Sequence, residues 1–201
     1  MQKVLIWDWP VRIGHWLMAG GFCLAWLTAE SESWRLVHVL AGATVFAVAT
    51  FRLVWGFIGS RHARFEDFVG GPDSVRRYLV SLLRLRPDHH AGHNPAGGLA
   101  IVLLLLLGIL SSLSGWMIYN DLGGHWLEEL HEGLAATMLA VVLVHLAGVA
   151  AGSLLHHENL VAAMFTGRKQ ALPGEAIASV RPLAALFLLA WVALASWWLA
   201  S

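Results

Sequence analysis

Charged side chains are scarce in this chain of 201 residues, since 13% are Asp, Glu, Lys or Arg while 58% are hydrophobic. The mean hydropathy is +0.65, and 13 basic side chains balance 13 acidic ones. This composition excludes an ordinary soluble domain and gives no sign of a nucleic-acid partner. It predicts an all-α membrane protein that crosses the bilayer several times.

Cysteine is nearly absent as well, because Cys23 is the only one and lies in an apolar stretch. A single thiol excludes a disulfide within the chain and a Cys-x-x-Cys-His motif for covalent haem attachment. We therefore expect Cys23 to be a packing residue.

Long apolar stretches are what the chain has instead, and five of them approach the roughly 20 residues that a helix needs to cross a bilayer. We expect membrane-spanning helices at about residues 11–28, 34–58, 96–119, 131–155 and 182–200. Asp8, Pro10 and His15 interrupt the start of the first stretch, so we expect it to be retained rather than cleaved as a signal peptide. The third stretch has no ionisable residue, which predicts a packing role.

The longest polar segment lies between the second and third stretches, at residues 60–96. Its portion PDSVRRYLVSLLRLRP places leucines and arginines on different sides of a helix. This pattern predicts a short helix on the membrane surface. Asn94 and Pro95 then predict the start of the next helix, as a capping residue followed by proline.

Basic residues are unevenly distributed over the predicted links. Every Lys and Arg except Arg35 belongs to one side of the predicted membrane. Because cytoplasmic links of membrane proteins carry the excess of Lys and Arg, this asymmetry predicts a cytoplasmic N-terminus and a periplasmic C-terminus.

Histidines recur at matching depths of the predicted helices. His131 and His145 lie fourteen residues apart, which is about 21 Å along nearly the same face of one helix. With the orientation above, His38 lies at the outer level of His131, and His15 lies at the inner level of His145. Ionisable side chains in lipid are costly and usually functional, so each level is a candidate site.

Two imidazoles that face each other from different helices can bind a haem iron from both sides. Gly42 follows His38 by one turn, and Gly148 follows His145 by nearly one turn. The absence of a side chain there would let a flat macrocycle approach the backbone, while close helix packing is the alternative. The four predicted axial ligands are His15, His38, His131 and His145.

Three arginines near the predicted membrane surfaces are candidates to bind haem propionates. The guanidinium groups of Arg12, Arg35 and Arg52 match a carboxylate well. Snorkelling to lipid phosphate is the alternative for each.

Other polar groups mark possible contacts on the two sides of the membrane. His93, with His156 or His157, is a candidate to line a cytoplasmic quinone pocket, and ordinary solvated histidines are the alternative. The outer segment 120–132 is acidic and could attract a basic redox partner, or it could simply be a polar loop.

Several local sequences resemble the bacterial cytochrome b561 family, whose members include the b subunits of nickel-iron hydrogenases and formate dehydrogenase. The similar segments are WDWPVRIGHW, FRLVWGFIGSRHARFEDF, GHNPAGG and HHENLVAAMFTGRK, together with the His-x13-His spacing. The resemblance covers about residues 4–170. It implies a four-helix transmembrane bundle over residues 1–170 that holds two b haems on the four histidines above. Residues 171–201, a linker and a fifth helix, depart from that four-helix core.

A haem with both axial positions filled has no open site for oxygen or substrate, so we expect electron transfer rather than catalysis. The expected function is to carry electrons between the quinone pool and a periplasmic c-type cytochrome or dehydrogenase subunit, in the bacterial inner membrane. A superoxide:quinone oxidoreductase is the first alternative, but Arg35 alone would attract an anion on the outer side. A divalent-metal transporter is the second, but carboxylates are missing from the spans. Membrane lipid and a second copy of the chain are further expected partners.

Overall fold

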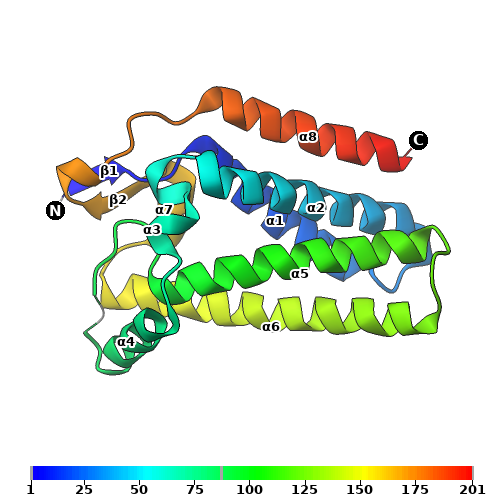
Figure 1. Ribbon diagram of the computed structural model, residues 1–201, viewed down its shortest axis with the longest axis horizontal. Helices are drawn as coiled ribbons and strands as arrows, with labels where there is room; N and C mark the ends of the chain where they lie inside the picture. Colours follow the sequence, from blue (N-terminus) through cyan, green and yellow to red (C-terminus); the bar gives the residue numbers. More distant parts are fainter. Residues whose placement is uncertain (1, 87, 201) are drawn as a thin grey trace.

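Five long helices run side by side in the computed structural model, which describes residues 2–86 and 88–200 (Figure 1). They are α1 (Trp9–Thr28), α2 (Arg35–Ile58), α5 (Pro95–Tyr119), α6 (His125–Leu155) and α8 (Pro182–Ala200). The helix predicted to begin near residue 131 begins six residues earlier, at His125.

Side-chain caps fix where two of these helices begin. The carboxylate of Asp8 accepts a hydrogen bond of 2.9 Å from the backbone N–H of Val11 at the start of α1. The side chain of Asn94 accepts one of 2.8 Å from the N–H of Gly97 at the start of α5. Each bond satisfies an N–H group that has no partner within the helix. The predicted Asn94–Pro95 helix start is therefore confirmed.

Four helical segments are long and apolar enough to cross a membrane. These are Glu32–Ile58, Pro95–Tyr119, His125–Leu155 and Pro182–Leu199. The helix α1 has sufficient length, but Arg12 and His15 lower its mean hydropathy. The expectation of a helical membrane protein is confirmed, while five spans and a division of the chain near residue 170 stay predictions.

The helices pack in a row rather than in a closed ring. The helix α1 packs along α2, α2 along α5, and α5 along α6, while α8 lies against α2 and α1. Small residues permit two of these contacts: a Cβ on Gly21 would lie 3.2 Å from the carbonyl oxygen of Ala41, and one on Gly108 would lie 3.1 Å from Val45. Among the described residues, α6 has its main helix contact with α5 and is otherwise largely exposed.

The two ends of the bundle differ in construction. One end, here called the sheet end, carries strands β1 (Gln2–Leu5) and β2 (Arg168–Ala171), which pair antiparallel. The short helices α3 (Phe65–Phe68), α4 (Pro72–Leu83) and α7 (Leu160–Thr166) lie at the same end. The other end, here called the link end, has the short links 29–34 and 120–124 and the end of α8.

One cluster of buried residues lies at the sheet end, in addition to side chains such as Val48 and Leu188 that are buried within the helices. Ile6, Trp7 and Asp8 are 0%, 3% and 0% exposed, and they follow β1 directly. They pack with Ala63 and Ala91, which come from the long segment between α2 and α5. This cluster, here called the cap, joins segments that are far apart in the sequence, and Val11 of α1, Trp55 of α2 and Met164 of α7 pack in it or against it.

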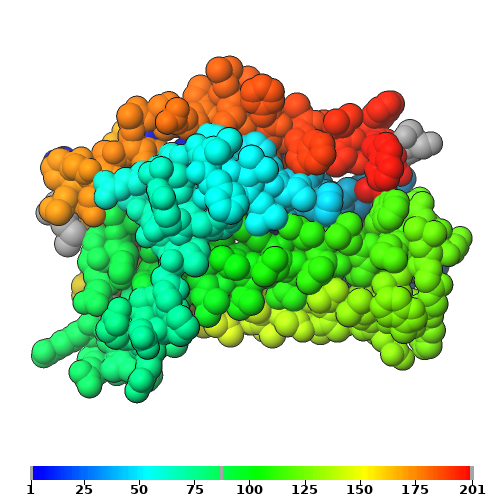
Figure 2. Space-filling model, viewed as in Figure 1, coloured from blue at the N-terminus to red at the C-terminus, as the bar shows by residue number. Residues whose placement is uncertain are grey.

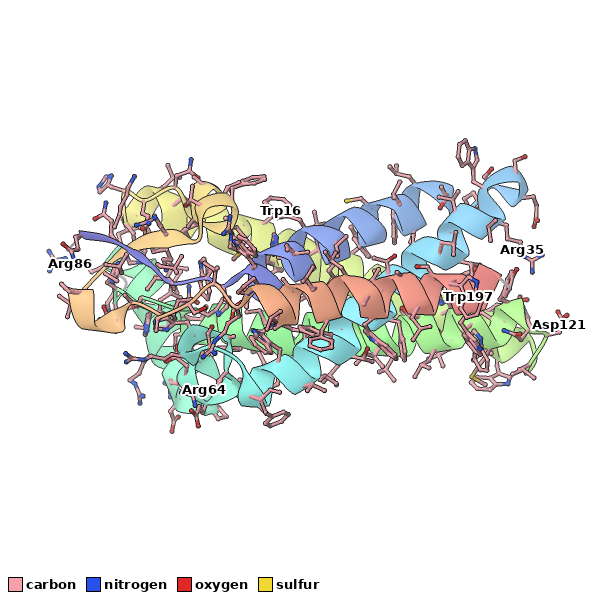
Figure 3. All side chains as sticks on the ribbon, turned by 90° about the horizontal axis from the view of Figure 1, so that it is seen from above. Trp16, Arg35, Arg64, Arg86, Asp121 and Trp197 are labelled. Carbon is pink, nitrogen blue, oxygen red and sulfur yellow. The ribbon has the colours of Figure 1, made fainter. Side chains whose placement is uncertain are left out.

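Charge follows the same division. Figure 3 shows Arg64 and Arg86 at the sheet end and Arg35 and Asp121 at the link end. The distribution matches the sequence pattern, in which Arg35 is the one basic residue on its side.

Candidate functional site

Near the link end, the structure brings the rings of His38 of α2 and His131 of α6 close together. Their ring centres are 6.2 Å apart, and the ring planes are inclined by 69°. These two residues are 93 positions apart in the sequence and come from helices whose main packing partners are other helices. Their approach is therefore a specific feature of the bundle.

Main-chain carbonyl groups hold both rings in place. The Nδ1 atom of His38 donates to the carbonyl oxygen of Ala25 on α1 at 2.8 Å. The Nδ1 atom of His131 lies 3.0 Å from the carbonyl oxygen of Ser111 and 3.1 Å from the hydroxyl of Ser114, both on α5. A carbonyl only accepts, so Nδ1 carries the proton in each ring and Nε2 of the neutral ring keeps a free lone pair. This is how metal-binding histidines are usually oriented.

The spacing of the two rings fits a metal bound between them. An imidazole nitrogen binds a metal at about 2.0–2.1 Å, so two rings on opposite sides of one metal have centres about 6 Å apart. The observed separation of His38 and His131 is 6.2 Å. A Cβ on Gly115 would lie 3.0 Å from Cε1 of His131, so glycine at this position leaves room for the ring.

Near the sheet end, His15 of α1 and His145 of α6 lie close enough for their charges to interact. The ring of His15 meets Trp16 edge-on, with ring centres 4.8 Å apart. Its Nδ1 is buried and has no hydrogen-bond partner among the described residues. Because buried polar atoms are nearly always paired, this pair is incomplete in the protein alone.

The two predicted haem-facing glycines border open space. A Cβ added at Gly42 or Gly148 would meet no atom within 4 Å, whereas one at Gly14 would lie 3.3 Å from Val48. Close packing between helices explains Gly14 but neither Gly42 nor Gly148. Space beside these two glycines is compatible with a flat group that lies against the helices.

Each of the three predicted propionate-binding arginines already has a partner in the protein. Arg12 donates to the carbonyl oxygens of Met164 and Phe165 near the end of α7. Arg52 is 8% exposed and donates to the carbonyl oxygen of Ala63 at 2.7 Å. Arg35 lies over the ring of Tyr119 at 5.3 Å. Their role toward a haem stays a prediction.

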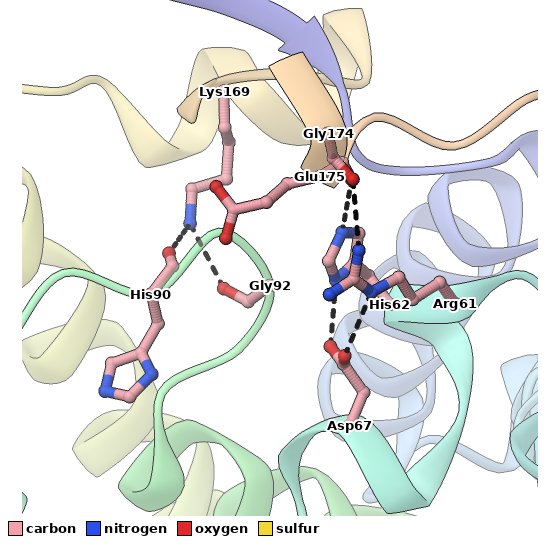
Figure 4. Close-up of polar contacts among 8 residues, drawn as sticks. All are labelled: Arg61, His62, Asp67, His90, Gly92, Lys169, Gly174 and Glu175. Carbon is pink, nitrogen blue, oxygen red and sulfur yellow. Dashed lines mark hydrogen bonds and ion pairs between the residues drawn. The ribbon is translucent and has the colours of Figure 1, made fainter. Parts of the chain in front are cut away.

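A polar network joins several segments of the sheet end (Figure 4). His62 is 2% exposed, and its ring nitrogens each lie 2.8 Å from an oxygen, one of the Asp67 carboxylate and one of the Glu175 carbonyl. The Nζ of Lys169 donates to the carbonyl oxygens of His90 and Gly92 at 3.0 and 3.1 Å. Burial lowers the pKa of Lys169 below its ordinary value. The network ties the segment before α5 to β2.

His93 lies between two aromatic rings at this end. Its ring centre lies 4.4 Å from that of Trp7 and 4.8 Å from that of Phe68, and its buried Nδ1 has no partner among residues 2–86 and 88–200. Burial holds the pKa of His93 well below its ordinary value, and the charges of Arg52 and Lys169 act in the same direction. His93 is therefore neutral at physiological pH.

The three histidines predicted for a quinone pocket do not line one cavity. His156 lines a pocket of about 30 Å³ together with His89 and Lys169, and that volume admits water rather than a ring. His93 and His157 are outside this lining, and His157 is exposed. A quinone site formed by these residues stays a prediction.

The supporting atoms of His38 and His131 are what sequence reasoning missed. Carbonyl oxygens such as that of Ala25 occur at every residue and leave no signal. Ser111 and Ser114, spaced for one helix face in an otherwise apolar span, were the one available signal. The helix α5 therefore packs against its neighbours and also orients the ring of His131.

Comparison with known proteins decides the family. Residues 6–167 match the family model of prokaryotic cytochrome b561. The chain belongs to the prokaryotic cytochrome b561 family. The resemblance that the sequence motifs indicated is thereby confirmed. The names of the family and of its curated relatives, which are B-type cytochromes, imply haem b as the cofactor. The chain spans about 60% of the length of the first curated relatives that it matches.

The relatives are cytochrome subunits of one kind. The chain is 27% identical to the probable Ni/Fe-hydrogenase 1 B-type cytochrome subunit of Escherichia coli (strain K12), over 58% of this chain and 60% of that protein. It is 23% identical to the probable Ni/Fe-hydrogenase B-type cytochrome subunit of Rhodobacter capsulatus, over 83% and 81%. The corresponding protein of Azotobacter chroococcum mcd 1 is 30% identical over 63% and 65%. No solved structure matches the chain.

Proposed function

We propose that this cytochrome b561 binds two b haems and carries electrons across the membrane between a quinone and a periplasmic redox partner. His38 and His131 would bind the haem near the link end, and His15 and His145 the haem near the sheet end. The haems supply one-electron redox chemistry when bound. Arg12, Arg35 and Arg52 would lie near the surfaces at which propionates emerge.

The observation that carries the proposal is the geometry of the His38–His131 pair. The rings stand 6.2 Å apart with each Nδ1 bound to a main-chain carbonyl, so both Nε2 atoms are available to one metal. His15 and His145 interact electrostatically at a second depth, where Nδ1 of His15 has no partner among the described residues. Because His131 and His145 belong to one continuous helix, the two levels differ by about 21 Å.

Charge supports the orientation of the proposed electron path. The sheet end holds the basic segments, so the positive-inside rule favours a cytoplasmic sheet end and a periplasmic link end. The His38–His131 level then lies nearest the periplasmic partner. A haem iron with histidine at both axial positions has no open position for a substrate, which favours electron transfer over catalysis at either level.

The redox partner would dock at the link end. The relatives named above are hydrogenase cytochrome subunits, which favours a periplasmic hydrogenase-like dehydrogenase subunit as the partner; a basic c-type cytochrome is the other candidate. The exposed carboxylates of Glu128 and Glu129 lie at this end, at the start of α6, where His125 contacts both. They would attract a basic surface of the partner.

The two alternative functions gain little from the structure. A superoxide:quinone oxidoreductase would need a positive entrance, but Arg35 is the one basic residue at the link end and lies over the ring of Tyr119. A divalent-metal transporter would need clustered ligands, and within the described part of the chain no three His, Cys, Asp or Glu side chains are placed to bind a metal ion.

Oxidation and reduction in proteoliposomes test the proposal. Protein oriented with its link end outward is reduced with a membrane-permeant quinol, and haem absorbance is followed while oxidised cytochrome c is added outside. We expect quinol to reduce both haems and the external protein to reoxidise them. Failure of quinol to reduce either haem, or reoxidation only after the vesicles are opened with detergent, would overturn the proposal. Rapid haem reduction by superoxide in the absence of quinol would favour the enzyme alternative.

A further inference from the structure

The amphipathic helix α4 presents three kinds of surface. Tyr78 is 5% exposed and anchors the helix, with its ring centre 5.8 Å from that of His90. Next to this side, Leu79 and Leu83 are exposed, Leu83 by 83%, although both are apolar. The remaining side carries arginines. Among the described residues, the Tyr78 side is the one that is buried against the rest of the protein, and the leucine side is exposed.

The arginine side of α4 forms an open groove of about 650 Å³. Its lining includes four guanidinium groups, and Asp73 is the single acidic residue among the lining side chains. Among residues 2–86 and 88–200, these arginines have no carboxylate within 4.0 Å, whereas Arg64 on the neighbouring segment pairs with Glu66 at 3.0 Å. The four arginines of the groove are Arg76, Arg77, Arg84 and Arg86.

The position of α4 places both unsatisfied surfaces at the membrane boundary. The helix lies at the sheet end against α5, near the residue at which the apolar length of α5 begins (Figure 1). Figure 2 shows it protruding sideways from the bundle. Exposed leucines at this depth meet the acyl-chain boundary, and arginines beside them meet the level of the phosphates.

We propose that the α4 groove binds the phosphodiester headgroup of an anionic phospholipid. Leu79 and Leu83 would contact its acyl chains while Arg76, Arg77 and Arg84 bind the phosphate. Arginine suits this task because its planar fork of donors matches phosphate oxygens bidentately. Clusters of basic residues next to a transmembrane helix attract anionic headgroups in the same way.

An anionic lipid fits the groove better than an acidic protein does. The arginines stand directly beside exposed leucines on one helix of twelve residues, so the ligand must combine negative charge with hydrocarbon. A lipid supplies both, at the depth where both surfaces lie. The positive-inside rule accounts for basic charge at this end of the molecule, but it does not account for exposed leucines that adjoin it.

Native mass spectrometry of the full haem-loaded protein in detergent tests the proposal. The probes are phosphatidylglycerol and phosphatidylcholine with identical acyl chains, each titrated separately, and inorganic phosphate as competitor. Wild-type protein should retain phosphatidylglycerol in preference to phosphatidylcholine, and millimolar phosphate should not displace it. Because each basic side chain strengthens attraction to an anionic surface by about fivefold, the triple variant R76Q/R77Q/R84Q should bind phosphatidylglycerol at least about tenfold more weakly.

The matched control removes three other exposed basic side chains of the same end, in the variant K3Q/R168Q/R181Q. It changes net charge equally but leaves the groove intact, so its phosphatidylglycerol affinity should stay within about twofold of wild type. Equal weakening in both triple variants, or equal binding of the two lipids by wild type, would overturn the proposal. If the groove variant fails to bind haem or to fold, Arg77→Gln and Arg84→Gln are tested singly, each with an expected loss of about fivefold. No loss in either single variant would also overturn it.

Discussion

The two histidine pairs of this cytochrome b561 are built differently. At the link end, His38 and His131 are fixed by carbonyl oxygens on neighbouring helices and already stand at the separation that one shared metal requires. At the sheet end, His15 and His145 share the same helix bundle, but Nδ1 of His15 is buried without a partner among the described residues. The sheet end also holds the buried charged side chains of Asp8, Arg52 and Lys169.

This difference indicates two ways of preparing a binding site. The link-end pair is preorganised by its immediate neighbours, so the ligand rings need little adjustment when a group binds between them. At the sheet end no such neighbour holds Nδ1 of His15 among the described residues, and the buried Asp8 lies two turns before His15 on the chain. The link-end site should therefore respond to changes beside the rings, and the sheet-end site to changes in the cap.

Removal of a ligand is the largest perturbation that can separate the two pairs. His131→Ala should lose the link-end haem while part of the sheet-end haem remains, and His145→Ala should show the reverse. Haem per chain, measured by pyridine haemochrome absorbance, and the spectrum of the remaining haem report the result. The exposed His125 of the same helix is the control, and His125→Ala should keep both haems. Loss of both haems from each variant while the helices stay folded would contradict the pairing.

The cap should be sensitive to loss of Asp8. Its carboxylate caps α1 through Val11 and accepts a hydrogen bond of 3.0 Å from Nε1 of Trp55. Two charge-assisted bonds at a buried position are lost in Asp8→Ala, so the free energy of unfolding should fall by about 3 kcal/mol. Denaturant unfolding followed by circular dichroism checks this value. The control is Glu66→Ala, which removes an exposed carboxylate. Equal free energies of unfolding in the two variants would show that Asp8 does not stabilise the sheet end.

At the link end, the corresponding change is Gly42→Ala. The new methyl group meets nothing in the protein within 4 Å, so the haem-free protein should be as stable as wild type or slightly more stable. A haem against this helix would be overpacked, and haem affinity should fall by about 2 kcal/mol, or about thirtyfold. The affinity is measured from the amount of haem that passes from the protein to excess haem-free globin. The control Gly133→Ala, on another face of α6, should retain haem as well as wild type does. If Gly42→Ala also retained haem as well as wild type, no group would lie beside α2.

Acid should weaken the sheet end through His93. Burial holds the pKa of His93 well below its ordinary value, so the folded state stays neutral while the unfolded state takes up a proton near pH 6.5. Neutral His93 therefore costs the folded state nothing at pH 7.5. As the pH falls to 5.5, proton uptake by the unfolded state lowers the free energy of unfolding by about 1.4 kcal/mol. His93→Phe should remove this part of the pH dependence in unfolding experiments at the two pH values. A variant with an unchanged pH slope would refute the assignment.

The sequence was sufficient for features that rest on local patterns. Asn94 and Pro95 predicted the start of α5, and the spacing of leucines and arginines predicted α4, because capping and amphipathicity depend on nearby residues. The depths of the four histidines followed from helix rise and the direction of each span. The pairing of His38 with His131 in space agrees with that reasoning, although their role as ligands stays a prediction.

Other features required the structure because their partners are distant in the sequence. The strands β1 and β2 pair Gln2 with Ala171, and four-residue strands without alternation give no signal of their own. The helix α6 begins at His125 because the polar residues before the apolar stretch continue the helix, with His125 contacting Glu128 one turn later. Main-chain acceptors such as the carbonyl of Ala25 have no sequence signature.

The haem content of the purified, folded chain tests the central claim most directly. Iron and haem are measured per polypeptide on protein saturated with haem b, and the wild-type value is compared with that of His38→Ala. The account predicts two b haems per wild-type chain and one in the variant. A saturated wild-type chain with a single haem, or a His38→Ala chain that still holds two, would contradict it.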